Sequence, residues 1–147
     1  SAPVGSLVAG SKSFIERANR VRRSLGGAMR QAGIIAAPGL VALRTMIPRL
    51  RDDHEHARLL AERLAAVPGL AIDLASVQSN IVNLDVGGLG LDAATFAAHL
   101  RERGVRGLPG MGTSVRFVTY RGITRADVNS AADAIAALVE SRPWTDR

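Results

Sequence analysis

The sequence predicts an α/β protein in which long helices are followed by a small α+β lobe. Before Gly69, apolar residues recur at helical spacing. The first such stripe consists of Phe14, Ala18, Val21 and Leu25. After Gly69 the period changes, and apolar and polar residues alternate over residues 80–86 as they do in a strand. We therefore divide the chain near Gly69, into residues 1–69 and 70–147.

A short apolar segment and an amphipathic helix are expected first. Residues 4–9 are predicted to form a strand that ends at Gly10, and Ser11 or Ser13 follows as the N-cap of the helix. The apolar stripe of this helix is expected to be buried, whereas its other face carries arginines.

Two more helices follow. One is predicted to begin near Met29, and over residues 32–46 it is apolar on nearly every side. Such a helix is typical of the centre of a larger domain or of a subunit interface. Pro38 should kink it, because proline removes a hydrogen-bond donor and crowds the preceding turn. Pro48 suits the first turn of the next helix, which Pro68 should end.

The second half is predicted to contain strands and two helices. Strands are expected at residues 70–74, 80–86, 105–108 and 114–120, and helices at residues 92–103 and 124–138. Thr124 and Asp127 have the spacing of a capping box at the start of the last helix. Residues 87–90 are expected to form a turn, because they lack the Lys-Ser/Thr of a phosphate loop. The tail around Trp144 is expected to be loose.

The composition restricts the function classes. Hydrophobic residues make up 47% of the chain but aromatic residues only 3%, so the core must consist of Ala, Val, Leu and Ile. There is no cysteine, which excludes disulfides and Cys-ligated metals and fits a cytoplasmic protein. No apolar run is long enough to span a bilayer, and the N-terminus does not resemble a secretory signal. We therefore expect no membrane association.

The formal net charge of +6 permits binding to nucleic acid or to another acidic surface. Lys12 is the only lysine, and an Arg- and Ala-heavy composition is typical of a genome-wide bias. The scarcity of aromatic side chains argues against single-strand binding, and no helix-turn-helix or zinc pattern supports duplex binding. We therefore expect no nucleic-acid partner.

No self-contained active site is evident. His54 and His56 lie two residues apart on a predicted helix, so they do not share a face, and no metal site is expected. Asp52 and Asp53 resemble a solvated helical face. The sequence contains no Gly-x-Ser-x-Gly motif and no obvious pair of catalytic carboxylates.

Residues 17–33 are the first candidate for ligand binding. A basic helix ends in the pair Gly26-Gly27, and Arg30 is expected in the first turn of the next helix. A helix start exposes unpaired N–H groups and the positive end of the dipole, so Arg23 and Arg30 on either side of the glycines could bind a phosphate. The alternative is that Gly26 is a helix C-cap and the arginines are solvated. The spacing alone favours this alternative.

Arg116 is the second candidate, because it stands inside an apolar strand between Val115 and Phe117. The alternative is an outward-facing residue of a one-sided sheet, which is common.

Residues 23–33, Arg-Ser-Leu-Gly-Gly-Ala-Met-Arg-Gln-Ala-Gly, resemble a signature stretch of the pyridoxal-phosphate-dependent threonine aldolases, of the low-specificity or L-allo-threonine type. Three more stretches look like landmarks of this family in the right order: residues 2–6, 53–57 and 115–119. The resemblance implies the C-terminal part of an aspartate-aminotransferase-like fold (fold type I). Residues 1–69 would then end the large cofactor domain with its long connecting helices, and residues 70–147 would form the small domain.

The resemblance also implies roles for the candidate residues. Arg30, helped by Arg23, would hold the cofactor phosphate of a neighbouring subunit in a homo-oligomer. Arg116 would bind the carboxylate of a β-hydroxy-α-amino acid, for which a planar guanidinium is suited. The intact enzyme would cleave threonine or allo-threonine to glycine and acetaldehyde. This sequence departs from the family at Tyr120, where histidine is usual, and at Ala28, which replaces a glycine.

In the family, the cofactor lysine lies a few residues before the position of Ala2, outside this sequence. Lys12 aligns with the following helix and does not replace it. Because pyridoxal chemistry requires that lysine, we expect this chain alone to be inactive and not to bind the cofactor by itself. Two alternatives remain. One is another fold-type-I pyridoxal enzyme, such as a β-eliminating lyase, and the other is a non-catalytic basic module that binds through residues 17–30.

Overall fold

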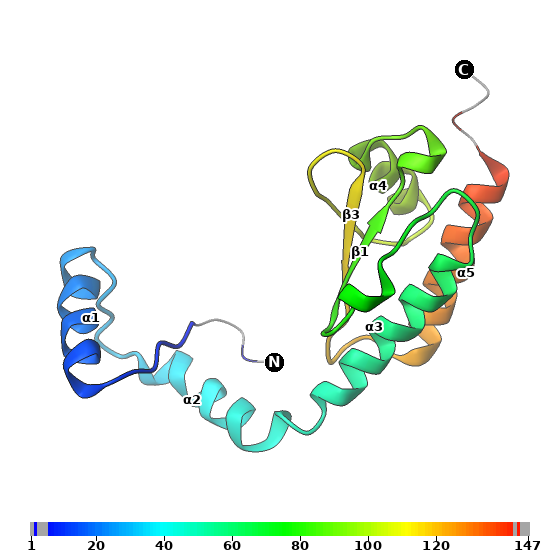
Figure 1. Ribbon diagram of the computed structural model, residues 1–147. Coiled ribbons are helices and arrows are strands. Elements are labelled where there is room, and N and C mark those ends of the chain that lie inside the picture. The colour runs from blue at the N-terminus through cyan, green and yellow to red at the C-terminus, as the bar shows by residue number, and fades with distance from the viewer. Residues whose placement is uncertain (1, 3–5, 143, 145–147) are drawn as a thin grey trace. The chain divides into compact units, whose positions relative to one another are not determined.

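The computed structural model of the chain describes residues 2, 6–142 and 144. The chain divides into two compact units, Ser1–Pro48 and Arg49–Arg147 (Figure 1). This division falls before the predicted boundary near Gly69, because the helix that precedes Gly69 packs against the sheet and the last helix of the second unit. The assignment of residues 1–69 and 70–147 to two domains of a larger enzyme stays a prediction.

The first unit consists of three helical segments. They are α1 (Lys12–Ser24), α2 (Gly33–Val41) and the π-helix η1 (Ala42–Met46). α1 begins where the sequence predicts, and the hydroxyl of Ser11 accepts a hydrogen bond from the backbone N–H of Phe14 at 3.3 Å. Ser11 rather than Ser13 is therefore the N-cap.

A Schellman turn ends α1. Gly26 has a φ of +75°, and its N–H donates to the carbonyl of Arg23 at 3.1 Å, while the N–H of Gly27 donates to the carbonyl of Arg22 at 2.8 Å. A Cβ on Gly27 would lie 2.9 Å from Cγ of Arg22. Gly26 thus allows the positive φ of the turn, and Gly27 leaves room for the Arg22 side chain. The interpretation of Gly26 as a C-terminal cap is confirmed.

Two predicted boundaries in this unit are wrong. Residues 6–9 form no strand, and residues 4 and 5 lie outside the described residues. The described part of this unit contains no other strand with which they could pair. α2 begins at Gly33 rather than near Met29, so Arg30 lies in a turn before the helix. No capping side chain stands before Met29 to fix a helix start there.

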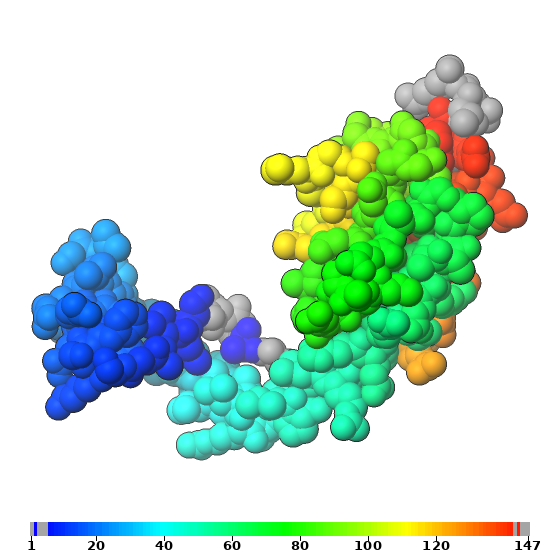
Figure 2. All heavy atoms as spheres, viewed as in Figure 1, coloured from blue at the N-terminus to red at the C-terminus, as the bar shows by residue number. Residues whose placement is uncertain are grey.

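The apolar side chains of the first unit are not buried within it. None of residues 6–48 is buried, and the side chains of Leu25 and Ile34 are 81% and 75% exposed. Figure 2 shows the side chains of this unit, in blue and cyan, open on the face in view. The predicted burial of the α1 stripe is therefore absent in this unit, because the described residues of the unit form no second layer that covers it. The kink expected at Pro38 stays a prediction, and an irregular segment begins four residues later, where α2 passes into η1.

The second unit is a three-stranded antiparallel sheet with helices on one face. The strands are β1 (Ile81–Asp85), β2 (Leu108–Pro109) and β3 (Ser114–Val118), in the order β1-β3-β2. The helices are α3 (Leu50–Ala65), α4 (Ala93–Glu102) and α5 (Arg125–Ser141), with short 3-10 turns at η2 (Leu74–Ser76) and η3 (Gly87–Leu89). α3 and α5 lie side by side along the sheet (Figure 1). The α/β class is confirmed.

The core lies between this sheet and the helices, and it is built mainly from aliphatic side chains. Every second residue of β1 and β3 is buried, namely Val82, Leu84, Val115 and Phe117. They pack with Leu64, Phe96, Leu100, Ile135 and Leu138 from the helices. The alternation predicted for residues 80–86 is thus confirmed, and it leaves the opposite face of the sheet without a helix.

Capping and end signals in this unit are confirmed, whereas two strands are shorter than predicted. Thr124 and Asp127 form the reciprocal capping box of α5. The strand expected at residues 70–74 is reduced to a single bridge, Ala71↔Asp85, because Asp73 caps the turn η2 instead. Residues 105–108 contribute only Leu108 to a strand. The tail is not loose at Trp144, whose ring lies 6.5 Å from that of Phe96.

Among the described residues, no single helix is long and apolar enough to cross a membrane; only the broken pair of residues 33–46 and α3 reaches that length and composition.

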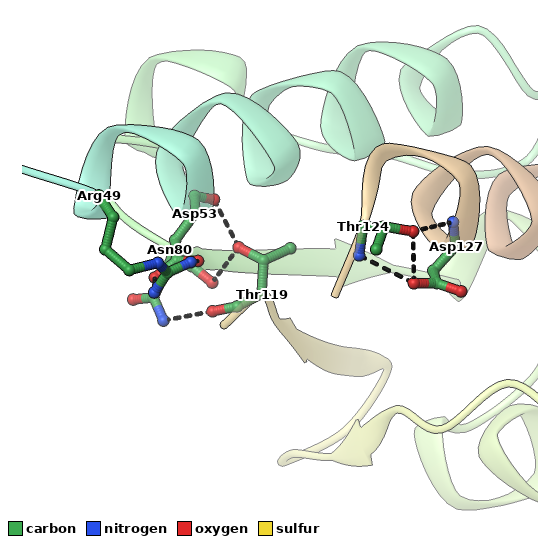
Figure 3. A network of polar contacts seen from close by, with 6 residues as sticks. All are labelled: Arg49, Asp53, Asn80, Thr119, Thr124 and Asp127. Carbon is green, nitrogen blue, oxygen red and sulfur yellow. Dashed lines mark hydrogen bonds and ion pairs between the residues drawn. The ribbon is translucent and has the colours of Figure 1, made fainter. Parts of the chain in front are cut away.

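A polar cluster holds the start of α3 to the sheet (Figure 3). Arg49 donates two hydrogen bonds to the Asp53 carboxylate, at 2.6 and 3.1 Å, and the Asp53 side chain is only 6% exposed. The hydroxyl of Thr119 donates to the backbone carbonyl of Asp53 at 2.5 Å. Asp53 is therefore not part of a solvated face, which corrects the sequence interpretation. The ion pair neutralises the carboxylate where helix and sheet meet.

Replacing Arg49 by methionine should destabilise the chain by about 3 kcal/mol, because the buried Asp53 carboxylate loses its partner. The double variant Arg49→Met/Asp53→Leu should recover most of this loss. Urea denaturation measures both. As a control, Glu62→Gln breaks the exposed ion pair with Arg58 on the same helix and should cost about 0.5 kcal/mol. Equal losses for Arg49→Met and Glu62→Gln would contradict the prediction.

The capping box should make α5 sensitive to acid. Hydrogen bonds from the side chain and then the backbone of Thr124 lower the pKa of Asp127 below its ordinary value of 3.8. Because the folded-state pKa is lowered, the ionised carboxylate stabilises the fold above pH 4 or so, and this contribution is lost as the pH falls through the folded pKa. Asp127→Asn should therefore lower the unfolding temperature at pH 7, and the difference should shrink as the pH falls below 4 or so. A pH-independent difference in calorimetry would contradict this.

Candidate functional site

The first candidate group is the end of α1 with the glycine turn after it. Arg22 and Arg23 lie in the last turn of α1, and Arg30 lies in the turn before α2. Arg23 and Arg30 are exposed, and within the described residues neither guanidinium has a hydrogen bond or an ion pair. Two unpartnered guanidinium groups thus flank the Gly26-Gly27 turn in sequence and are available to an anion.

The helix start expected to complete this group lies elsewhere. α2 begins at Gly33, and its N-cap residue, Ala32, provides no side-chain hydrogen bond to the first turn. The carbonyl of Ala32 accepts from the N–H groups of Ile35 and Ala36, at 3.1 and 2.9 Å. The uncapped amides at the start of α2 therefore follow Arg30 rather than coincide with it. An anion bound here would contact the Arg30 guanidinium. The positive end of the α2 dipole lies three residues later in the sequence, at Gly33.

The net positive charge of the chain is confined to the first unit. Residues 1–48 contain seven of the 19 basic residues and one of the 13 acidic residues, Glu16, which gives a formal charge of +6. Residues 49–147 contain twelve of each and are neutral overall. A bias in composition alone would affect both units, so this distribution favours an anion-binding role for the first unit.

Arg116, the second candidate, lies on the face of the sheet that no helix of the second unit covers. It is exposed in β3, directly opposite Asn83 of β1 and Leu108 of β2. In the described part of the chain its guanidinium has neither an ion pair nor a hydrogen bond. This geometry suits a carboxylate ligand, and it also fits the alternative of an outward-facing strand residue.

A carboxylate on the same sheet face is already engaged. Asp85 accepts a hydrogen bond from the backbone N–H of Gly87 at 2.8 Å. This bond and a second one from the Thr113 side chain lower the pKa of Asp85, so it is ionised at neutral pH. It does not pair with Arg116. The arginine therefore keeps its donors for a ligand, next to one fixed negative charge.

The second unit contains a cavity of about 520 Å³ between the end of β3, residues 103–106 and the start of α5. Its lining is largely apolar, with Tyr120, Arg106 and Asp127 among the polar groups. Arg116 is not among the residues that line it, whereas Val118, on the same face of β3, is. Tyr120, the position at which the sequence departs from the threonine aldolases, lines this cavity.

The structure reveals a polar cluster that sequence reasoning missed. Thr119, Asp53 and Asn80 are joined by hydrogen bonds that span 39 and 66 residues of sequence. Asp53 and Thr119 belong to residues 53–57 and 115–119, two of the stretches that resemble the threonine aldolases, and this resemblance could have drawn attention to them. Among the described residues, no group of three or more His, Asp or Glu side chains could hold a metal.

The candidate residues are thus distributed over both units. Arg23 and Arg30 belong to Ser1–Pro48, and Arg116 belongs to Arg49–Arg147. Each candidate arginine has free guanidinium donors, and none of the three lines the cavity at the end of β3 or the one between residues 66–68 and the end of α5.

Comparison with known proteins shows which proteins the chain is similar to. Residues 1–86 match the family model for β-eliminating lyases. The chain is 42% identical over 129 residues to low-specificity L-threonine aldolase 1 of Arabidopsis thaliana, covering 87% of this chain and 36% of the relative. It is 39% identical over 132 residues to probable low-specificity L-threonine aldolase 2 of that plant, covering 86% and 36%. It is 35% identical over 130 residues to the Escherichia coli low-specificity L-threonine aldolase, covering 88% and 37%.

The chain therefore spans little more than a third of the length of these curated relatives. The match to the family model covers more than half of the chain, and the resemblance seen in residues 23–33 is confirmed by relatives that match over most of it. The chain belongs to the β-eliminating lyase family.

Proposed function

We propose that this chain is the C-terminal portion of a pyridoxal-phosphate-dependent threonine aldolase, which cleaves threonine or allo-threonine to glycine and acetaldehyde. The observation that carries the proposal is the 35–42% identity to proteins named threonine aldolases over most of the chain. The free guanidinium groups of Arg30 and Arg116 support it, because the cofactor carries a phosphate and the substrate carries a carboxylate.

The residues present suit the phosphate end of the cofactor. Arg23 and Arg30 are exposed, unpartnered within the described chain and part of a unit with a charge of +6. They would hold the phosphate by charge-assisted hydrogen bonds, and in a homo-oligomer this cofactor could belong to a neighbouring subunit. When bound, pyridoxal phosphate supplies the electron sink for breaking the Cα–Cβ bond of the substrate. The reactive lysine is expected outside this sequence, so the chain alone is expected to be inactive.

Arg116 would orient the substrate. Two parallel N–H donors on a planar guanidinium match the two oxygens of a carboxylate, so one contact fixes both position and orientation. Fixing the carboxylate also fixes the Cα atom next to it, at which the bond breaks. The open sheet face around Arg116 leaves room for the rest of the amino acid.

The first unit would be covered in the intact enzyme. Its described residues include no buried side chain, although α2 is apolar on nearly every side. The remaining part of the enzyme or another subunit would bury this surface, and burial by another subunit would make the enzyme a homo-oligomer. A cytoplasmic location is part of the same proposal.

The charge of the first unit also suits a second candidate, a basic module that binds nucleic acid. The two candidates differ in what Arg30 contacts. A DNA affinity that falls with salt and survives Arg30→Ala would favour the basic module.

Arg116→Gln should raise the KM for threonine about 30-fold or more in a protein that includes the segment with the cofactor lysine, because a charge-assisted bidentate contact is lost. Arg116→Lys should recover only part of the affinity, since an ammonium lacks the planar fork. Arg101→Gln, an exposed arginine on α4, is the control and should leave the KM unchanged. Steady-state kinetics measure all three. An unchanged KM in Arg116→Gln would overturn this assignment.

Arg30→Gln should weaken pyridoxal phosphate binding about tenfold in the same protein, because one charge-assisted contact to the phosphate is lost. Cofactor titration by absorbance measures the affinity, and competition by inorganic phosphate isolates the contribution of the anion. Arg44→Gln is the matched control, because Arg44 is exposed in the same unit. Equal losses for the two variants would show that general charge, and not the position of Arg30, attracts the cofactor.

A further inference from the structure

The strand that carries Arg116 is weakly held on one side. β2 pairs with β3 only through Leu108↔Arg116 and Pro109↔Val115. Beyond Arg116, β3 has a strand partner only in β1, and that ladder ends at Ile81↔Val118. The end of β3 therefore depends on contacts that are not part of the sheet.

Thr119 provides these contacts. Its N–H donates to the carbonyl of Asn80 at 2.9 Å, and its carbonyl accepts from the Asn80 side-chain amide at 2.7 Å. Its hydroxyl donates to the backbone carbonyl of Asp53 at 2.5 Å. Thr119 is 3% exposed, and the bond from its hydroxyl to Asp53 is buried. Figure 3 shows how they bring the end of β3, the residue before β1 and the first turns of α3 together.

The α3 end of this contact is itself fixed. Asp53 lies one turn into α3, and the two hydrogen bonds from Arg49 hold its carboxylate. The carbonyl that Thr119 contacts is thus part of a regular helix with a neutralised buried charge. A threonine hydroxyl in this position ties the strand to a rigid element.

We propose that Thr119 is a positioning residue for Arg116, which it serves by fixing the register and the end of β3. The inference rests on the proposed function, in which Arg116 binds the substrate carboxylate. Thr119 does not act on substrate itself. Side chains alternate between the two faces of a strand, so Thr119 lies on the helix-covered face with Val115 and Phe117, and Arg116 lies on the open face.

The register of β3 matters because even the smallest error in it would displace Arg116 completely. A shift of β3 by one residue would move Arg116 to the helix-covered face and expose Phe117. A smaller displacement of the strand end would move the guanidinium relative to its ligand. A misplacement on the order of 1 Å at a binding group can reduce activity by about a hundredfold.

The test compares threonine variants in a protein that includes the cofactor lysine. Thr119→Val removes the hydroxyl and keeps the β-branched shape, and Thr119→Ser keeps the hydroxyl. Thr124→Val is the matched control, because it removes a threonine hydroxyl whose hydrogen bonds are made with Asp127 in the cap of α5 (Figure 3). The readouts are KM and kcat for threonine, and amide hydrogen exchange of residues 114–120 in the cofactor-free protein.

We expect Thr119→Val to raise the KM for threonine about tenfold or more with a smaller change in kcat. Hydrogen exchange of residues 114–120 should become faster. Thr119→Ser should restore both values, and Thr124→Val should change neither. The double variant Arg116→Gln/Thr119→Val should have the KM of Arg116→Gln, because Thr119 acts only through Arg116.

Three results would overturn the inference. They are an equal KM for Thr119→Val and Thr124→Val, additive effects in the double variant, and unchanged hydrogen exchange in Thr119→Val. If Thr119→Val does not fold, Asn80→Ala tests the same strand end with the same expected rise in KM. A raised KM in Arg116→Gln with an unchanged KM in Thr119→Val refutes this inference alone. An unchanged KM in Arg116→Gln refutes the role of Arg116 and this inference together, whereas a protein with the cofactor lysine that does not cleave threonine refutes the proposed function.

Discussion

The hydrogen bond from the Thr119 hydroxyl to the Asp53 carbonyl joins the two polar residues that are buried in the described part of the chain. Buried polar groups are stable only when they are partnered, and here Arg49 and Asn80 complete the set. The central strand β3 has a two-residue partner on one side, so its position is decided largely by this cluster and by β1. The positions of the side chains on the open face of the sheet therefore depend on contacts made at the opposite, buried face.

The first unit has no comparable constraint. Its glycine turn is fixed locally by two hydrogen bonds, but none of its described residues is buried. Exposed apolar surface is costly, at about 25 cal/mol per Å². Side chains such as Leu25 and Ile34 therefore gain no stabilisation by burial within this unit. This agrees with the fact that the chain spans little more than a third of its curated relatives.

The features predictable from the sequence were those whose causes lie within a few residues. The cap at Ser11, the glycine turn, the alternation of β1 and the Thr124–Asp127 box all depend on neighbours in the chain. The buried role of Asp53 was not predictable, because its decisive partner lies 66 residues away and the local pattern is that of a solvated helix. The strand expected at residues 70–74 failed for a related reason, since a strand needs a partner as well as a pattern. At the candidate site, alternation predicts the exposure of Arg116, but an arginine free to bind a ligand and one that is merely solvated have the same pattern.

The distribution of charge bears on why the two candidate groups belong to different units. A phosphate carries up to two negative charges, whereas an amino-acid carboxylate carries one. The first unit has a formal charge of +6, and the second is neutral, with the ionised Asp85 on the same sheet face as Arg116. A strongly positive unit attracts a dianion from a distance. A single arginine in a unit without net charge exerts little long-range attraction, so it selects its carboxylate ligand through the geometry of its hydrogen bonds. This difference matches the two roles that we propose, because a cofactor must be retained and a substrate must be oriented and then released.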